Sequence, residues 1–181
     1  MSKEKVTKNF LDSGQLEIED ESIFLIQTHS QGPSGKIELS DEVLKHAPSG
    51  NLFGLSQNVG MGWSPKNFLG PQFLILNSHG GVRSEDGSPI ALGYHTGHWE
   101  IGLLVKRAAE EMKKLGCIPF AAHISDPCDG RSQGTTAMFD SLAYRNDASL
   151  VMRRLARSLP TAEGVMAIAT CDKSMPAMMM T

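Results

Sequence analysis

Two short segments of the chain place a thiol directly beside a carboxylate, and the second segment adds an amine. The first is Cys128-Asp129, and the second is Cys171-Asp172-Lys173. Thiolates bind soft or borderline metals such as zinc and the iron of iron–sulfur centres, whereas carboxylates prefer magnesium, calcium or manganese. The repeated pairing makes a metal site the hypothesis to test. The alternative is two turns with buried cysteines, because free cysteine is among the most buried residue types.

Lys173 lies where a helix is predicted to begin, because Pro176 suits the first turn of a helix. A cation at that end of a helix is disfavoured by about 0.3–1 kcal/mol. Such breaks of a local rule tend to mark functional sites. The plainer interpretation is that Lys173 pairs with Asp172 or points to solvent, and spacing alone leaves both open.

The third cysteine and the histidines give weaker signals. Cys117 follows Gly116 and precedes an apolar run, so it is predicted to pack in the core. His79, His95 and His98 lie in or beside glycine-rich loops and lack the spacing of a zinc motif, so surface or structural roles are expected. Three cysteines without an export signal indicate reduced thiols and a cytoplasmic protein.

The elements that must position these residues alternate along the chain. Three apolar runs predict strands, at residues 73–76, 118–124 and 165–169. Between them, residues 98–115 and 146–158 show apolar residues at helical spacing, with Asn146 as the expected cap of the second helix. This alternation indicates an α/β fold with a parallel sheet flanked by helices. The last two strands lead into the two thiol segments, which are therefore expected to meet at one edge of the sheet.

The N-terminal part of the chain gives less regular signals. The first 20 residues are polar and are expected to be a disordered tail, which leaves residues 21–181 as the α/β domain. Within that domain, residues 23–27 predict a short strand and residues 41–46 a brief helix. Residues 58–65 are rich in Gly, Asn, Ser and Pro, and they are interpreted as a loop.

At the other end, the predicted helix from Pro176 stops at Thr181 after barely one turn. So short a helix has little stability of its own. We therefore expect an α/β domain that is incomplete at its C-terminus, as in a truncated chain or a fragment.

The composition excludes several classes of protein. The chain has 181 residues, of which 40% are hydrophobic and 20% charged, with a net charge of −3. These values are typical of a globular protein and give no support for a nucleic-acid partner or an anionic membrane surface. No apolar run approaches the roughly 20 residues needed to span a bilayer, so no membrane partner is expected.

Three segments carry a resemblance to a known family over roughly residues 50–181. The chain resembles the dihydroxy-acid dehydratase / phosphogluconate dehydratase family, in particular its sugar-acid branch of the D-xylonate dehydratase type. The most specific segment is Cys171-Asp172-Lys173 followed by Pro176, within a strand–turn–helix context. The other two segments are residues 93–100 and 125–135.

The resemblance implies a hydro-lyase that dehydrates a sugar acid to a 2-keto-3-deoxy acid. It also implies an iron–sulfur cluster, 2Fe-2S or 4Fe-4S, with one open iron as a Lewis acid, and a magnesium ion. By motif match, the resemblance implies that Cys171 is a cluster ligand and that Asp129 and Asp172 bind magnesium. It also implies that Lys173 is a catalytic lysine that becomes carbamylated and binds magnesium. Because family members are considerably longer, the resemblance further implies that the chain is the N-terminal part of a larger enzyme.

One departure from the family pattern concerns the first cluster ligand. Many relatives have a cluster cysteine before the long helix, where this chain has Gly97-His98. Either Cys128 supplies the thiolate, or His98 binds the cluster, or the cluster is held differently. The resemblance also places a further cysteine ligand and the catalytic base outside these residues, so the 181-residue chain alone is expected to be inactive.

Two alternatives to a sugar-acid dehydratase are kept. The first is the dihydroxy-acid dehydratase of branched-chain amino-acid biosynthesis, from the same family. The second is a non-catalytic α/β metal-binding module in which the thiols are structural. For the full-length protein we expect a small-molecule sugar acid as the partner, and assembly as a homo-oligomer.

Overall fold

The computed structural model describes residue 37, residues 39–125 and residues 127–181. The chain divides into two compact units, residues 1–65 and residues 66–181, which are described separately. The predicted tail and the predicted strand at residues 23–27 lie outside the described residues.

The described part of the first unit holds two helices, α2 (Asp41–His46) and α3 (Ser49–Gly60). The Ser40 side chain caps α2 by accepting a hydrogen bond from the Val43 N–H, and this helix was predicted. Helix α3 was not predicted, and it extends into the first three residues of the expected loop. Its glycine-rich composition is typical of a loop. One helical signal is nevertheless present, since Leu55 and Val59 are four residues apart, and both are buried.

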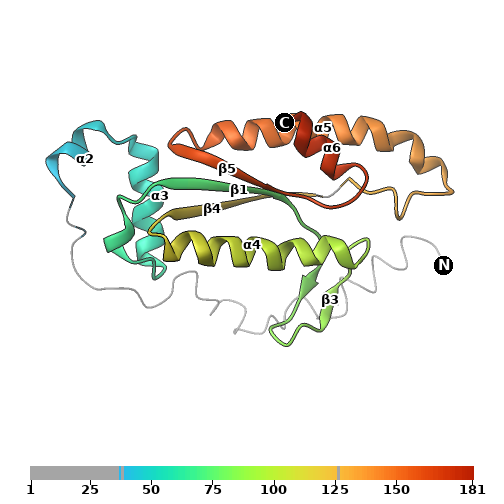
Figure 1. Cartoon of the computed structure of the whole chain (residues 1–181), viewed down its shortest axis with the longest axis horizontal. Helices are drawn as coiled ribbons and strands as arrows, with labels where there is room; N and C mark the ends of the chain where they lie inside the picture. The colour runs from blue at the N-terminus through green and yellow to red at the C-terminus, as the bar shows by residue number, and fades with distance from the viewer. Residues whose placement is uncertain (1–36, 38, 126) are drawn as a thin grey trace, which may run out of the picture. The chain divides into compact units, whose positions relative to one another are not determined.

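The second unit is built on a three-stranded parallel sheet (Figure 1). Strand β1 (Gln72–Ser78) lies in the centre, between β4 (Ile118–Ile124) and β5 (Ala162–Ile168). Both neighbours run parallel to β1. The predicted α/β fold is confirmed, and the predicted strands appear with small differences in their ends.

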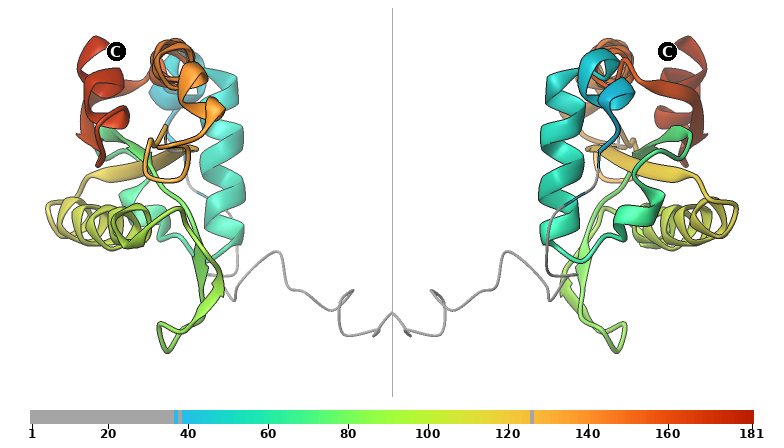
Figure 2. Two further views of the ribbon diagram at one scale, coloured as in Figure 1. Left: turned by 90° about the vertical axis from the view of Figure 1, so that its right-hand side faces the viewer. Right: turned by 90° about the vertical axis from the view of Figure 1, so that its left-hand side faces the viewer.

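Helices cover both faces of this sheet, as Figures 1 and 2 show. Helix α4 (Thr96–Lys114) packs on one face, and α5 (Ser141–Ser158) and α6 (Ser174–Met180) pack on the other. The alternation of β1 side chains explains this, because successive side chains of a strand point to opposite faces. Ile75 contacts the apolar face of α4, whereas Leu74 and Leu76 contact α5 and α6.

Two helix boundaries differ from those expected. Helix α4 begins two residues earlier than predicted, with His95 as its cap. Helix α5 begins at Ser141, directly after the 3-10 helix η3 (Thr136–Asp140), so the prediction of Asn146 as its cap is wrong. Residues 141–145 contain no helix breaker, and the Asn146 side chain instead accepts hydrogen bonds from Arg145.

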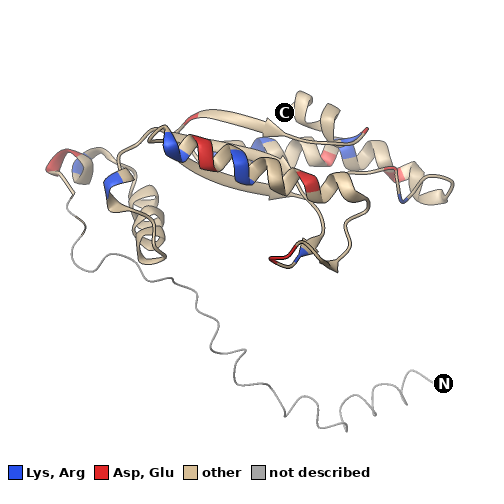
Figure 3. Cartoon of the chain, turned by 60° about the horizontal axis from the view of Figure 1, so that its bottom comes forward, with Lys and Arg blue, Asp and Glu red and all other residues tan. Residues whose placement is uncertain are grey.

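The outer face of α4 carries charges of both signs (Figure 3). Glu111 pairs with Arg107, four residues before it, and with Lys114, three residues after it, each at 2.8 Å. These spacings bring side chains together on a helix surface. No helix in the described part of the chain combines the length and the apolar character that crossing a membrane requires.

A short hairpin, β2 (Val82–Arg83) and β3 (Pro89–Ala91), connects β1 to α4. Its turn contains Gly87 with φ of +85°, a conformation that glycine adopts without strain. The Asp86 carboxylate accepts hydrogen bonds from Ser84 and Ser88 in this turn, and these bonds hold the pKa of Asp86 at about 2. The hairpin thereby brings the chain to the N-terminus of α4.

The segment before β1 allows a test of close packing. A Cβ atom added at Gly70 would collide with the Gly116 carbonyl oxygen, a backbone atom that cannot rotate away. We expect Gly70→Ala to lower the free energy of unfolding by about 1–3 kcal/mol, measured by urea titration. The control is Leu69→Ala, because Leu69 is exposed and its replacement should change stability by less than about 0.5 kcal/mol. Equal effects of the two substitutions would contradict the predicted clash.

Candidate metal-binding site

The carboxyl ends of β4 and β5 lie at the same edge of the sheet, because both strands pair in parallel with β1. The two thiol segments follow these ends and meet there. Cys171 Sγ lies 3.3 Å from Cys128 Sγ, although the residues are 43 positions apart. The expected convergence of the two segments is therefore observed.

The backbone at Cys171 has an unusual conformation. Among the described residues, Cys171 is the one non-glycine residue with a positive φ, at 75°. This region costs an L-amino acid roughly 1–2 kcal/mol, and such strain clusters at functional sites. Burial, followed by the hydrogen bond with Cys128, raises the pKa of the Cys171 thiol to about 12. A metal that binds here therefore has to displace a proton.

Two histidines lie beside the thiols. His95 Nε2 is 3.2 Å from Cys171 Sγ and 2.9 Å from Nε2 of His98. One donor atom from each of the four residues, Cys128 included, lies within 4.8 Å of the other three. This group is the candidate metal centre, and we call it the His–Cys group.

From the sequence, His95 was not predicted to bind a metal, and His98 was considered as a ligand only through the resemblance. The spacing of the two histidines contained the missing signal, because residues i and i+3 come together on one face at the start of a helix. His98 is 1% exposed. Its burial, and then the charge of His95, lower the pKa of His98 to about 4. The ring is therefore neutral at pH 7, which is the form that binds metals.

The carboxylates form a second group around Lys173. The Lys173 ammonium donates hydrogen bonds to Oδ2 of Asp129 and, at 2.9 Å, to Oδ2 of Asp172. The side chains of Lys173 and Asp129 are 15% and 13% exposed, whereas Asp172 is about half exposed. The simpler interpretation, a pair between Lys173 and Asp172, is thus observed, but Asp129 belongs to the same network.

We call Lys173, Asp129 and Asp172 the carboxylate–lysine group, and one of its buried oxygen atoms makes no hydrogen bond within the described part of the chain. Oδ1 of Asp129 is buried and has no hydrogen-bond partner among the described residues. The Asp129 carboxyl, followed by Asp172, raises the pKa of the Lys173 amine. The neighbouring Asp129 carboxyl, followed by the hydrogen bond that Lys173 donates, lowers the pKa of Asp172. The arrangement favours a positive charge between two carboxylates.

Cys117 lies outside both groups. It directly precedes β4, so it is at the amino end of the strand, and the candidate site is at the carboxyl end. Its side chain is half-buried, which is less than its predicted place in the core implied. The candidate site lies at the beginning of helix α4, whereas Cys117 lies just beyond the end of this helix.

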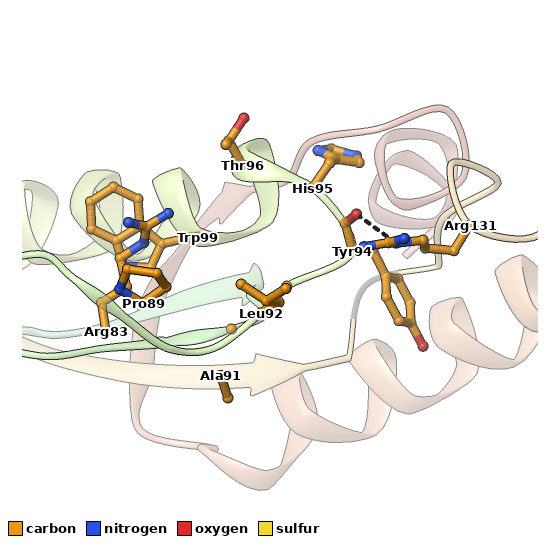
Figure 4. Close-up of a pocket in the computed structure, with 11 residues that line it drawn as sticks. Arg83, Pro89, Ala91, Leu92, Tyr94, His95, Thr96, Trp99 and Arg131 are labelled. Atoms are coloured by element: carbon orange, nitrogen blue, oxygen red, sulfur yellow. Dashed lines mark hydrogen bonds between the residues drawn. The ribbon is translucent and has the colours of Figure 1, made fainter.

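Two hollows adjoin the His–Cys group. The first, of about 170 Å³, lies between the β2–β3 hairpin and the start of α4, and Arg131 Nε donates across it to the Tyr94 carbonyl oxygen at 3.1 Å (Figure 4). The Arg83 guanidinium lies 4.2 Å from the centre of the Trp99 ring in its wall. The second, of about 330 Å³, opens beside Cys128. Its walls consist mostly of hydroxyl and charged side chains, namely Tyr94, Arg131, Ser132, Asp140, Ser141 and Tyr144.

Comparison with known proteins identifies the family. The model of the dihydroxy-acid/6-phosphogluconate dehydratase N-terminal domain matches residues 90–181, about half of the chain. The chain is 56% identical over 161 residues to "D-xylonate dehydratase YagF" of Escherichia coli (strain K12), which covers 89% of the chain. It is 52% identical over 162 residues to "D-xylonate dehydratase YjhG" of the same organism, which covers 90% of the chain.

The chain spans about a quarter of the length of these two relatives, since the matches cover 25% of each. The matched family region contains both the His–Cys group and the carboxylate–lysine group. The resemblance seen in the sequence is thereby confirmed, and the chain belongs to the dihydroxy-acid/6-phosphogluconate dehydratase family.

Proposed function

We propose that the protein that carries this chain is a hydro-lyase, which dehydrates a sugar acid such as D-xylonate to the 2-keto-3-deoxy acid. The observation that carries the proposal is the meeting of two thiols with a neighbouring pair of carboxylates at one sheet edge. The names of the two relatives support D-xylonate as the substrate. The three free thiols are in keeping with a reducing compartment such as the cytoplasm.

The donor chemistry of the two groups fits two different inorganic partners. Cys128 and Cys171 offer soft sulfur ligands, which suit the iron of an iron–sulfur cluster. Asp129 and Asp172 offer hard oxygen ligands, which suit magnesium, and the unpartnered Oδ1 of Asp129 is an acceptor still to be used. When bound, the open iron would polarise the leaving hydroxyl, and magnesium would stabilise the negative charge that develops beside the substrate carboxylate.

In the proposed site, Lys173 is carbamylated on its side-chain nitrogen. In that reaction a bond forms between Nζ of the neutral amine and the carbon of CO2, and the nitrogen releases one proton. The product carries a negative charge and two oxygens, so it changes a competing cation into a third hard ligand beside Asp129 and Asp172. The position of Nζ between the two carboxylates supports this role.

The hollow beside Cys128 is proposed as the place for the substrate. A polyhydroxy acid needs one cationic group for its carboxylate and several partners for its hydroxyls. Arg131 supplies the cation in this wall, and Ser132 and Tyr144 are among the side chains that supply hydroxyls. These side chains would bind and orient the acid, so that its reacting carbons lie beside the thiol and carboxylate groups.

The test compares substrates on the whole protein, reconstituted without oxygen with iron, sulfide and magnesium. We expect 2-keto acid to form from D-xylonate, with a kcat/KM roughly 10-fold or more above that for a branched 2,3-dihydroxy acid. The reverse preference would favour the dihydroxy-acid dehydratase. Absence of both turnover and acid-labile sulfide would favour a non-catalytic metal-binding module. The 181-residue chain alone should give no turnover, and steady turnover by it would overturn our view of the site.

A further inference from the structure

The His–Cys group contains two histidines that the proposed function does not use. His95 caps α4, and His98 follows in the first turn of the same helix. Their rings meet edge to face, with centroids 4.1 Å apart. Both rings face the thiols rather than one of them pointing away, since each offers a nitrogen within 4.8 Å of both sulfur atoms. The question is which nitrogen carries a proton and which carries a lone pair.

The cap of α4 answers this question for His95. Its Nδ1 accepts a hydrogen bond from the Gly97 N–H at 3.2 Å, so Nδ1 carries the lone pair. In the neutral imidazole the proton is then on Nε2. A protonated nitrogen cannot bind a metal, but it can donate a hydrogen bond. Two acceptors are within reach of this proton, Nε2 of His98 at 2.9 Å and Sγ of Cys171 at 3.2 Å.

The contact between the two rings then assigns the lone pair of His98. Because His95 Nε2 is a donor, Nε2 of His98 is the acceptor of the 2.9 Å contact and carries the lone pair. The residue is firmly held, because the Gly80 N–H donates to the His98 carbonyl oxygen at 3.1 Å. His98 is therefore a neutral, buried imidazole whose lone pair lies within 4.8 Å of two thiol sulfurs, and such a nitrogen is suited to bind a metal.

The spacing of the donor atoms agrees with a shared metal. Two ligand atoms of one tetrahedral ion lie about 3.4–3.8 Å apart, given bond lengths of about 2.1–2.3 Å. The two sulfur atoms are 3.3 Å apart, and the whole group lies within 4.8 Å. Small side-chain movements are therefore enough to bring two sulfurs and one nitrogen around a metal.

We infer that His98 is a third protein ligand of the metal centre at Cys128 and Cys171, through Nε2, and that His95 is a positioning residue. When a metal takes the lone pair of His98, the Nε2 proton of His95 donates to the Cys171 thiolate instead. In the isolated chain, three protein ligands leave the fourth position of a tetrahedral metal open, which is the ligand number of catalytic metal sites. The inference rests on the proposed function for its two thiolates, and it makes this chain able to bind a metal by itself.

Cobalt(II) is the probe for this test, because its thiolate complexes absorb visible and near-ultraviolet light. The reduced, metal-free chain is titrated without oxygen, and we expect one Co²⁺ per chain with the charge-transfer absorption of two thiolates. His98→Leu should weaken binding by roughly 100-fold or more, since a ligand is lost. His98→Cys should keep the binding and raise the charge-transfer absorption by about half, since soft thiolates become three. Circular dichroism checks the fold of each variant.

The role of His95 has its own readout. Asn is a good N-cap, so His95→Asn keeps the cap of α4 but is too short to reach the thiolate. We expect one Co²⁺ per chain, roughly 10-fold weaker binding and a charge-transfer band at longer wavelength, because the thiolate loses its hydrogen bond. An unchanged band would show that His95 acts only as a cap. Cys117→Ser is the control and should titrate like the unaltered chain.

The possible failures are distinguishable. If both His98 variants bind Co²⁺ with the affinity and spectrum of the unaltered chain while Cys171→Ser does not, the inference is wrong and the thiol centre stands. If Cys171→Ser also binds like the unaltered chain, or if the unaltered chain binds no Co²⁺, the thiol centre itself is wrong. Should His98→Leu fail to fold, the absorption of His98→Cys decides.

Discussion

Cys171→Ser should remove both the iron and the turnover of the whole protein. A serine hydroxyl is a hard donor and a poor replacement for a soft thiolate, and Cys171 Sγ is at the centre of the His–Cys group. Loss of a catalytic metal removes several kcal/mol of transition-state stabilisation. We therefore expect kcat/KM for the sugar acid to fall about 1000-fold or more, with iron and acid-labile sulfide near background.

Cys117→Ser is the matched control, because it makes the same chemical change at the opposite end of β4. Its iron content and its turnover should stay close to those of the unaltered protein. Iron analysis and turnover are measured on both variants after the same anaerobic reconstitution. Equal loss of iron from both would mean that Cys117 also holds the cluster, which the position of this residue argues against.

Substitution of Lys173 should separate the two groups of the site. Lys173→Arg keeps a positive charge beside Asp129 and Asp172 but cannot form the carbamate. We expect turnover to fall about 1000-fold or more while the iron content stays, because the hard-ligand group is damaged and the thiol group is not. The mass of the unaltered protein under native conditions should include one added CO2, and that of Lys173→Arg should not.

Two further variants complete the comparison. In the metal-free protein with an unmodified lysine, Lys173→Met leaves Asp129, only 13% exposed, without its cation, so thermal unfolding should show a loss of about 3 kcal/mol or more. Lys106→Met, on the exposed side of α4, should change neither stability nor turnover appreciably. Normal turnover by Lys173→Arg would show that this lysine serves only as an ion-pair partner.

The sheet and the meeting of the thiol segments could be predicted because both follow from local patterns. Strand β4 is a single apolar run bounded by turn residues, and its predicted limits, Ile118–Ile124, are those observed. Once two such strands are known to be parallel, their carboxyl ends must share an edge of the sheet. Cys128 and Cys171 then meet even though the sequence says nothing of the 3.3 Å between them.

The elements that were missed have physical reasons in common. Helix α3 carries glycines, serines and asparagines that favour turns, so only Leu55 and Val59 signal its buried face. The role of His95 depends on the direction of one backbone N–H, that of Gly97, which fixes the tautomer of the ring. Such a hydrogen bond exists only after folding, and composition and periodicity carry no trace of it.

The direct sequence adjacency of thiol and carboxylate has a consequence for how this site can change. Consecutive Cα atoms are 3.8 Å apart, so Asp129 cannot move far without Cys128, nor Asp172 without Cys171. The spacing between the soft and the hard donors is thus a property of the covalent chain and not of side-chain packing. Mutation elsewhere can reshape the walls beside Cys128, where Arg131 and the hydroxyl side chains lie, without altering that spacing. New substrate preferences are therefore expected to evolve through these walls, around thiol and carboxylate groups whose spacing is inherited unchanged.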